Sequence, residues 1–262
     1  MRKPLILVSN DDSFRAKGVH VLIDTLLKFG DVVAVCPQLP QSGKSMAITV
    51  NEPLKIIRQP DYNGAKMYAV TGTPVDCVKL SMHYVLDRKP DLVVAGINHG
   101  SNSAVNVLYS GTMGAAMEGC VFGIPSIGFS LTDHSADADF TPCLKAIDIL
   151  VENALRHGLP EDVCLNVNVP NICGIPQEMR VCEPCRGFWN DEYKEYTDPN
   201  GGKFYWLTGT YENLDPENTH TDEWALAHGM ISVVPVGVER SISKSVRVDW
   251  LEEACRQYKG LL

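Results

Sequence analysis

Apolar runs alternate with helical patterns along the first two thirds of the chain. The runs predict strands at 4–8, 31–35, 90–96, 124–130 and 163–169. Apolar residues spaced by three and four predict helices that begin at 19, 74, 112 and 142, and the last three extend to about 86, 122 and 157. Gly30 follows the first helix, where we expect a left-handed turn. The alternation indicates right-handed βαβ units in a mainly parallel sheet, with ligands bound beyond the carboxyl ends of the strands.

The pattern changes after Pro170. Residues 186–218 are rich in Gly, Asn, Asp, Glu and Tyr, with one clear strand at 204–208 and a hairpin signal near 200–202. Core-like sequence returns at 229–234, and an amphipathic helix is predicted at 248–258. We therefore expect one α/β domain over residues 1–262, with a protruding β-hairpin arm at 186–218 and a C-terminal helix.

Charge narrows the classes of partner. The 262 residues include 23 Lys plus Arg and 32 Asp plus Glu, a net charge of −9, whereas proteins that bind duplex DNA or anionic membranes usually carry a basic excess. The first apolar run is too short for a signal-peptide core or a membrane span. We expect a cytoplasmic protein that binds neither duplex nucleic acid nor membrane.

The nine cysteines lie mostly within apolar segments, so reduced core thiols are expected. Cys182 and Cys185 have the spacing of a redox or zinc pair. No second pair of cysteines or closely spaced histidines completes a structural zinc site, so we expect no zinc there.

Adjacent carboxylates, Asp11 and Asp12, stand where the first predicted strand ends. Such carboxylates repel each other and each loses water when buried, which a hard divalent cation can offset. A solvated turn in which one Asp caps the next helix is the plainer interpretation. The position at the carboxyl end of a strand favours a functional site.

A polar loop that contains Ser42 follows the second strand. Gly43, Lys44 and Ser45 resemble the end of a phosphate-binding P-loop, but that motif needs a glycine where Gln38 stands. We therefore reject a P-loop. Ser42 brings a hydroxyl to the same edge of the sheet as the Asp pair, although a plain turn is the favoured interpretation of this loop taken alone.

Two further clusters reach this edge. Asn98 and Asn102 lie in a glycine-rich loop after the strand at 90–96, and Ser110, Gly111 and Thr112 open a helix whose free N–H groups suit a phosphate. Ordinary helix capping by Ser110 is the alternative. His99 could act as an acid, but a loop histidine without an identified partner is more often a bystander.

Taken together, these segments resemble the SurE family of survival proteins in order and spacing. The matching segments are SNDD at 9–12, SG at 42–43, GTPVDCV at 72–78, GIN at 96–98, YSGT at 109–112, AAMEG at 115–119, LNVNVP at 165–170 and TD at 221–222, with Gly229, ISV at 231–233 and Pro235. Each motif is weak alone and their combination is specific.

The resemblance implies a divalent-metal-dependent phosphatase for nucleoside 5′- and often 3′-monophosphates. It also implies a Rossmann-like three-layer α/β/α sandwich with a C-terminal β-hairpin extension, and a homodimer or higher homo-oligomer. Carried over by position, Asp11, Asp12, Ser42 and Asn98 are the metal ligands, and this all-oxygen set suits Mg²⁺ or Mn²⁺. Asp11 and Asp12 are also the catalytic residues, and Asn102, Ser110, Gly111 and Thr112 bind the phosphate. Ser13 departs from the usual glycine, and the segment at 186–218 aligns poorly.

Attack by water on the phosphoryl group is the preferred mechanism, and direct attack by Asp11 or Asp12 is the alternative. A haloacid-dehalogenase-type enzyme needs its aspartates two positions apart with a threonine following, and the adjacent pair followed by Ser13 argues against that class. The remaining rival is a non-enzymatic nucleotide-sensing or phospho-acceptor module such as a receiver domain. That class needs a third aspartate where Asn98 stands, and it is about half this length.

Overall fold

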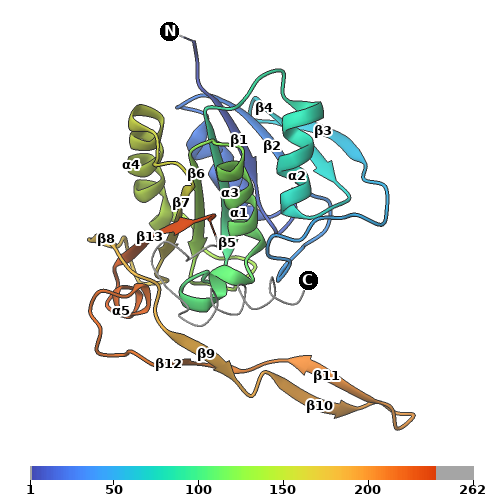
Figure 1. Cartoon of the computed structure of the whole chain (residues 1–262), viewed down its shortest axis with the longest axis vertical. Coiled ribbons are helices and arrows are strands. Elements are labelled where there is room, and N and C mark those ends of the chain that lie inside the picture. The colour runs from blue at the N-terminus through green and yellow to red at the C-terminus, as the bar shows by residue number, and fades with distance from the viewer. Residues whose placement is uncertain (1, 240–262) are drawn as a thin grey trace, which may run out of the picture.

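A nine-stranded sheet runs through the centre of the protein (Figure 1). The structure, a computed structural model, describes residues 2–239. The strands, in spatial order, are β3 (Ile56–Tyr62), β4 (Ala65–Val70), β2 (Asp31–Pro37), β1 (Leu5–Ser9), β5 (Leu92–His99), β6 (Ser126–Leu131), β7 (Val163–Val169), β13 (Ile231–Gly237) and β8 (Met179–Val181). From β4 to β7 all neighbouring strands are parallel, whereas β3 pairs antiparallel with β4 and β13 with β7. The predicted mainly parallel sheet is confirmed.

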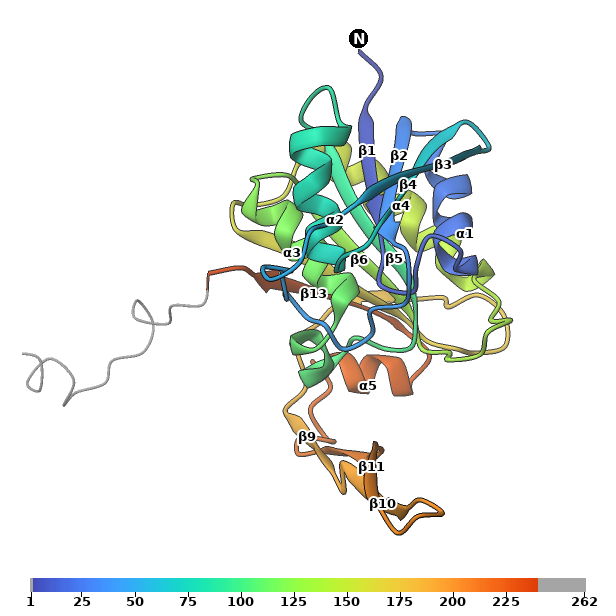
Figure 2. The same cartoon turned by 90° about the vertical axis from the view of Figure 1, so that its right-hand side faces the viewer.

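Helices cover both faces of this sheet (Figure 2). One face packs against α1 (Lys17–Leu26) and α4 (Thr141–His157), and the other against α2 (Pro74–Leu80) and α3 (Gly111–Val121). Successive strand residues alternate between the two cores, so Ile6 packs in the first core and Leu7 in the second. The three-layer α/β/α sandwich is therefore confirmed.

Two of the helix starts follow from capping residues. The Thr73 hydroxyl accepts a hydrogen bond from the Asp76 amide (3.1 Å), and the Asp76 carboxylate accepts one from the Thr73 amide (2.9 Å). Ser110 caps α3 by accepting from the Met113 amide (3.0 Å). Helix α2 continues directly into a π-helical turn, η1 (Ser81–Val85). Together, α2 and η1 cover nearly all of the helix predicted at 74–86.

An arm of two short antiparallel ladders projects from the end of the body opposite the N-terminus (Figures 1 and 2). Its strands are β9 (Gly187–Asn190), β10 (Tyr193–Thr197), β11 (Lys203–Leu207) and β12 (Thr210–Asn213), paired β9 with β12 and β10 with β11. The sequence indicated one of these strands. The chain returns through α5 (Asp222–Ala227) to β13. The helix predicted at 248–258 lies outside the described residues.

Two details of the sequence interpretation need correction. Gly30 does not adopt a left-handed conformation, and α1 ends earlier, at Leu26. Gly30 instead allows a close backbone approach, because a Cβ there would lie 2.5 Å from the Pro4 carbonyl oxygen. The strands β3 and β4 were not predicted. In β3 the strand pattern is weak because the strand is largely exposed and contains Pro60.

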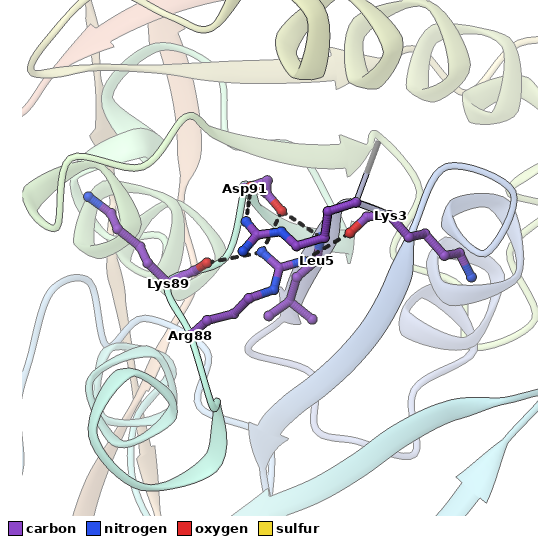
Figure 3. A network of polar contacts seen from close by, with 6 residues as sticks. Lys3, Leu5, Arg88, Lys89 and Asp91 are labelled. Carbon is purple, nitrogen blue, oxygen red and sulfur yellow. Dashed lines mark hydrogen bonds and ion pairs between the residues drawn. The ribbon is translucent and has the colours of Figure 1, made fainter.

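A polar network ties together the amino ends of β1 and β5 (Figure 3). The Asp91 carboxylate accepts from the Leu5 amide (2.7 Å) and from the Arg88 guanidinium (2.7 Å). Arg88 also donates to the Lys3 carbonyl oxygen (3.0 Å). The carboxyl ends of the same strands lie at the opposite edge of the sheet. None of the helices within residues 2–239 has the length and apolar character needed to cross a membrane.

Candidate active site

Asp11 lies buried beyond the end of β1, directly against the start of α3. The Thr112 hydroxyl donates a hydrogen bond to its Oδ1. Gly111 must lack a side chain here, because a Cβ would lie 2.8 Å from the Asp11 Cβ and 3.0 Å from its Oδ2. Two sequence clusters about 100 residues apart therefore meet in one place.

The two carboxylates are in an unfavourable environment for negative charge. Burial, reinforced by the charge of Asp12, raises the pKa of Asp11 to about 6, although the hydroxyl and backbone amide of Thr112 act in the opposite direction. Burial also raises the pKa of Asp12, opposed by the His99 amide and by the charges of His99 and His134. A bound cation would relieve the strain on both groups.

The loop after β2 joins Asp11 to the start of α3. The Gln41 amide donates to the Asp11 carbonyl oxygen (2.7 Å), so the residue before Ser42 contacts the backbone of the acidic pair. Ser45 donates through its amide to the Tyr109 carbonyl oxygen (3.0 Å). The Ser42 side chain is exposed, so its hydroxyl is accessible to a ligand.

Asn98 and Asp12 are brought together by the end of β5. The His99 amide donates to Oδ2 of Asp12 (3.2 Å), and the preceding residue, Asn98, is buried. The side-chain amide of Asn98 donates to the Gly100 carbonyl oxygen (2.9 Å), which fixes the orientation of the Asn98 side chain. Asp11, Asp12, Ser42 and Asn98 therefore all lie at the carboxyl edge of the sheet, as expected.

The donor set fits a hard divalent cation. Asp11 and Asp12 each use one carboxylate oxygen for a hydrogen bond, and Asn98 uses its amide nitrogen. Within residues 2–239 we find no hydrogen bond to Asp12 Oδ1 or Asn98 Oδ1, so these two side chains are oriented and each keeps one oxygen for a ligand. The Asp11 carboxylate accepts from both the hydroxyl and the backbone amide of Thr112. In that same range no three His, Cys, Asp or Glu gather as a metal centre. The candidate ligands besides the Asp pair, Asn98 and Ser42, are neutral oxygen donors.

Of the four residues assigned to phosphate, three use their side chains for hydrogen bonds within the protein. Ser110 uses its hydroxyl to cap α3, and Thr112 uses its hydroxyl on Asp11. Asn102 donates from its side-chain amide to Ser130 (2.8 Å), and its backbone is held by side chains of β7. The start of α3, including Gly111, remains the natural place for an anion because its first N–H groups have no helical partner.

Ser13 adopts a left-handed conformation, with φ of 83°. The Asn10 side chain donates to the Ser13 carbonyl oxygen (2.9 Å) and closes the turn that carries Asp11 and Asp12. A residue without a Cβ suits this backbone better, which explains why glycine is usual at this position in the resembled family.

His134 is a residue that the sequence interpretation missed. It lies three positions beyond the end of β6, its side chain is exposed, and its ring packs on the backbone of Gly100. Its charge is close enough to affect the pKa of Asp12. The rule used for Asp11, a polar residue just beyond a strand end, applies here and could have found it.

The cysteine pair lies between β8 and β9, near the base of the arm. Cys182 and Cys185 are both buried free thiols, and burial raises the pKa of each. The Cys185 thiol is 3.1 Å from the Asn213 side-chain oxygen. Cys36, Cys77, Cys120, Cys143 and Cys164 are likewise buried and free, and Cys173 is exposed. Seven of the eight described cysteines are therefore buried, as expected for core positions.

The fold and site define an α/β protein whose acidic, oxygen-rich edge faces the start of a glycine-rich helix. The family model for survival protein SurE matches residues 6–191. Two relatives carry the name 5′-nucleotidase SurE. The protein from Phocaeicola vulgatus is 48% identical over 90% of this chain and 92% of its own, and that from Bacteroides thetaiotaomicron is 44% identical over 98% of each. The crystal structure of the SurE protein from Aquifex aeolicus covers 95% of this chain and all of its own, with 34% identity and a TM-score of 0.80. The chain belongs to the SurE family.

Proposed function

We propose that this protein is a 5′-nucleotidase that hydrolyses nucleoside monophosphates to nucleoside and phosphate with the aid of a divalent cation. The observation that carries the proposal is the junction of Asp11 with Gly111 and Thr112, which puts an acidic pair against a helix start suited to phosphate. The relatives that match over most of both chains carry the 5′-nucleotidase name.

Asp11, Asp12, Asn98 and Ser42 would hold the cation. When bound, a divalent cation supplies charge that polarises a phosphoryl oxygen and lowers the pKa of a bound water. We infer Mg²⁺ or Mn²⁺ because the donors are carboxylate, amide and hydroxyl oxygens, with no thiolate or imidazole among them.

The start of α3 would receive the phosphate. Its amide groups carry a partial positive charge that complements the phosphate dianion and the charge developing on its oxygens during reaction. Ser110 fixes this helix start by capping it, and Gly111 lets the backbone approach closely. We infer that 5′-monophosphates, and 3′-monophosphates in addition, bind with the phosphate here and the nucleoside outward.

Water is the proposed nucleophile. Asp11 and Asp12 each spend one oxygen on a hydrogen bond. Those hydrogen bonds, together with a cation on both carboxylates, would lower the nucleophilicity of Asp11 and Asp12, whereas a water on the cation would become more acidic.

The nucleotidase relatives do not favour the phospho-acceptor alternative. The chain also has Asn98, a poor phosphate acceptor, at the end of β5. Incubation with acetyl phosphate separates the two functions, because a receiver module becomes labelled and a phosphatase releases phosphate.

We also infer a homo-oligomer in the cytoplasm. The arm exposes Tyr193, Trp206 and Leu207, whose side chains are 65–68% exposed, and large apolar side chains clustered on a projecting hairpin favour association with a second copy. Light scattering coupled to size exclusion would give the mass of the particle in solution.

Phosphate release from a panel of nucleoside 5′- and 3′-monophosphates tests the proposed function directly. Activity is expected with Mg²⁺ or Mn²⁺, loss in EDTA, and recovery when excess cation is added back. Asp11→Asn serves as the inactive control from the same purification. Full turnover in chelator, or equal turnover by Asp11→Asn, would refute the assigned site.

A further inference from the structure

The loop between β6 and α4 is joined by hydrogen bonds to the segment after Asn98 and to β7. The Gly100 amide donates to the Leu131 carbonyl oxygen (2.8 Å), which joins the end of β6 to the loop after Asn98. The Thr132 amide donates to the Val169 carbonyl oxygen (2.9 Å). The Asp133 carboxylate accepts from the Ser135 amide (2.8 Å), closing a turn around the intervening residue. That residue is His134.

The His134 ring packs against Gly100, in the loop that follows Asn98. A Cβ on Gly100 would overlap the imidazole, so the absence of a side chain there provides the space that the ring occupies. Gly100 is also the residue whose carbonyl oxygen orients Asn98 (2.9 Å). His134 therefore packs on the same short segment that orients a proposed cation ligand.

Two carboxylates lie within electrostatic reach of this imidazole, Asp12 after β1 and Asp133 on its own loop. The charge of His134 opposes the burial that raises the pKa of Asp12. It also adds to the hydrogen bonds from Ser135 that lower the pKa of Asp133. The imidazole thus lies close to Asp12, one of the proposed cation ligands.

A second histidine, His99, is less available. Its Nδ1 lies 2.9 Å from the Ser135 carbonyl oxygen, which only accepts, so this nitrogen carries the proton and donates it there. The His99 ring also packs edge-on against Phe140, with ring centroids 4.9 Å apart. In residues 2–239 we find no hydrogen bond to the His134 ring, which is exposed and keeps both nitrogens available.

Hydrolysis of a nucleotide requires a proton for its leaving oxygen. A nucleoside alkoxide is a poor leaving group, and histidine is the side chain whose ordinary pKa lies closest to neutrality. Apart from His99, the other side chains placed at the site are carboxylates, amides and hydroxyls. We propose that His134 is a catalytic residue that donates a proton to the leaving oxygen of the nucleoside. This inference rests on the proposed nucleotidase function.

The step balances without a further reactant. The water oxygen forms a bond to phosphorus, and the bond between phosphorus and the leaving oxygen breaks with its electron pair on that oxygen. The leaving oxygen takes the proton of His134, and the proton lost by water passes to solvent, from which His134 is protonated again. Ester and water become alcohol and phosphate.

Replacement of the bridging oxygen by sulfur gives the sharpest test. Adenosine 5′-monophosphate is compared with its analogue in which sulfur replaces the bridging 5′-oxygen, because a thiolate leaves readily without a proton. We expect His134→Gln to lower kcat about 100-fold on the oxygen substrate and less than about 5-fold on the sulfur substrate. His157→Gln, an exposed histidine in the last turn of α4, is the matched control and should change neither rate.

The outcomes separate cleanly. Equal loss on both substrates would mean that His134 only shapes the Gly100 segment, and no loss on either would exclude it from the reaction. If His99→Gln, but not His134→Gln, lost kcat on the oxygen substrate and kept it on the sulfur substrate, the proton donor would be His99. Each of these results overturns the proposal.

Wild-type turnover of the nucleotide, measured first, tests the proposed function, and the ratio of the two substrates tests His134. A calorimetric Mn²⁺ titration and a thermal melt of His134→Gln should match wild type. His134→Asn provides a second variant with a shorter side chain and the same expected ratio.

Discussion

The Thr112 hydroxyl donates a hydrogen bond to Oδ1 of Asp11, although the two residues lie 101 positions apart. The contact ties the loop after β1 to the first turn of α3. It also orients the Asp11 carboxylate, together with the Thr112 backbone amide. Thr112 therefore supports the cation site, in addition to standing in the segment assigned to phosphate.

We expect Thr112→Val to weaken Mn²⁺ binding and to lower turnover, because it leaves a buried carboxylate oxygen without its donor. Loss of such a partner costs about 1–3 kcal/mol of folding free energy, measurable by urea denaturation. Thr112→Ser keeps the hydroxyl and is the control. If the Val variant bound Mn²⁺ and turned over like the Ser variant, the hydrogen bond would have no part in the site.

Asp11→Asn is expected to abolish most turnover while leaving the fold intact. The pKa of Asp11 is raised from 3.8 to about 6, so the folded protein loses stability as pH rises through this interval and the buried carboxyl ionises. Asparagine avoids that cost. At pH 8 without metal, the variant should therefore melt at or above the temperature of wild type.

Addition of Mn²⁺ should reverse that order. Wild type gains stability from binding, and the variant, which lacks one ligand charge, gains little. Asp137→Asn, an exposed aspartate after β6, should behave like wild type in both conditions. Equal stabilisation of Asp11→Asn and wild type by Mn²⁺ would remove Asp11 from the ligand set.

The sheet and the position of the site were predictable because each rests on local pattern. Asp11, Asn98 and Ser110 follow apolar runs or open helices, and parallel strands bring such positions to one edge. The contact of Gly111 with Asp11 was not predictable, because nothing in either local sequence specifies a partner 100 residues away. The strand β3 escaped detection because its exposed, proline-containing sequence lacks a strand pattern.

Ser13→Gly should stabilise the protein. Ser13 holds a φ of 83°, which costs a residue with a Cβ about 1–2 kcal/mol relative to glycine. The gain is reduced by the greater entropy of glycine in the unfolded chain, so we expect about 0.5–1 kcal/mol in urea denaturation. Ser13→Ala keeps the Cβ and should show no gain. A Gly variant less stable than wild type would show that the Ser13 hydroxyl outweighs the strain.

Asp91→Asn tests the network at the opposite edge of the sheet (Figure 3). Burial alone would raise the pKa of Asp91, but hydrogen bonds from Arg88 and the Leu5 amide, with the charges of Arg88 and Arg2, lower it below 3.8. A lowered folded pKa stabilises the protein above the unfolded value and the contribution is lost on acidification. The carboxylate is partly exposed, so about 1 kcal/mol or less is expected at pH 7.

Urea denaturation should show this difference in the free energy of unfolding between wild type and variant at pH 7. The difference should disappear as the pH falls below 3.8. Asp87→Asn, an exposed neighbour on the same loop, is the control and should match wild type throughout. A gap that stayed constant with pH would attribute the effect to packing rather than to charge.

Asn98→Asp changes the site in the opposite electrostatic direction from Asp11→Asn. The added carboxylate should keep or tighten Mn²⁺ binding, because it brings a third negative charge to the cation. Turnover should fall, since that charge repels the phosphate dianion and offsets the cation's pull on it.

The structure adds a consequence for folding. The Asn98 side-chain amide donates to the Gly100 carbonyl oxygen (2.9 Å), and an aspartate would set an oxygen against that carbonyl instead. The metal-free Asn98→Asp protein should therefore melt below wild type, and Mn²⁺ should restore more of its stability than it adds to wild type. Thermal melts with and without Mn²⁺, alongside calorimetric titration and steady-state kinetics, measure all three effects. If the variant bound Mn²⁺ more weakly than wild type, Asn98 would orient the loop through Gly100 without contributing a cation ligand.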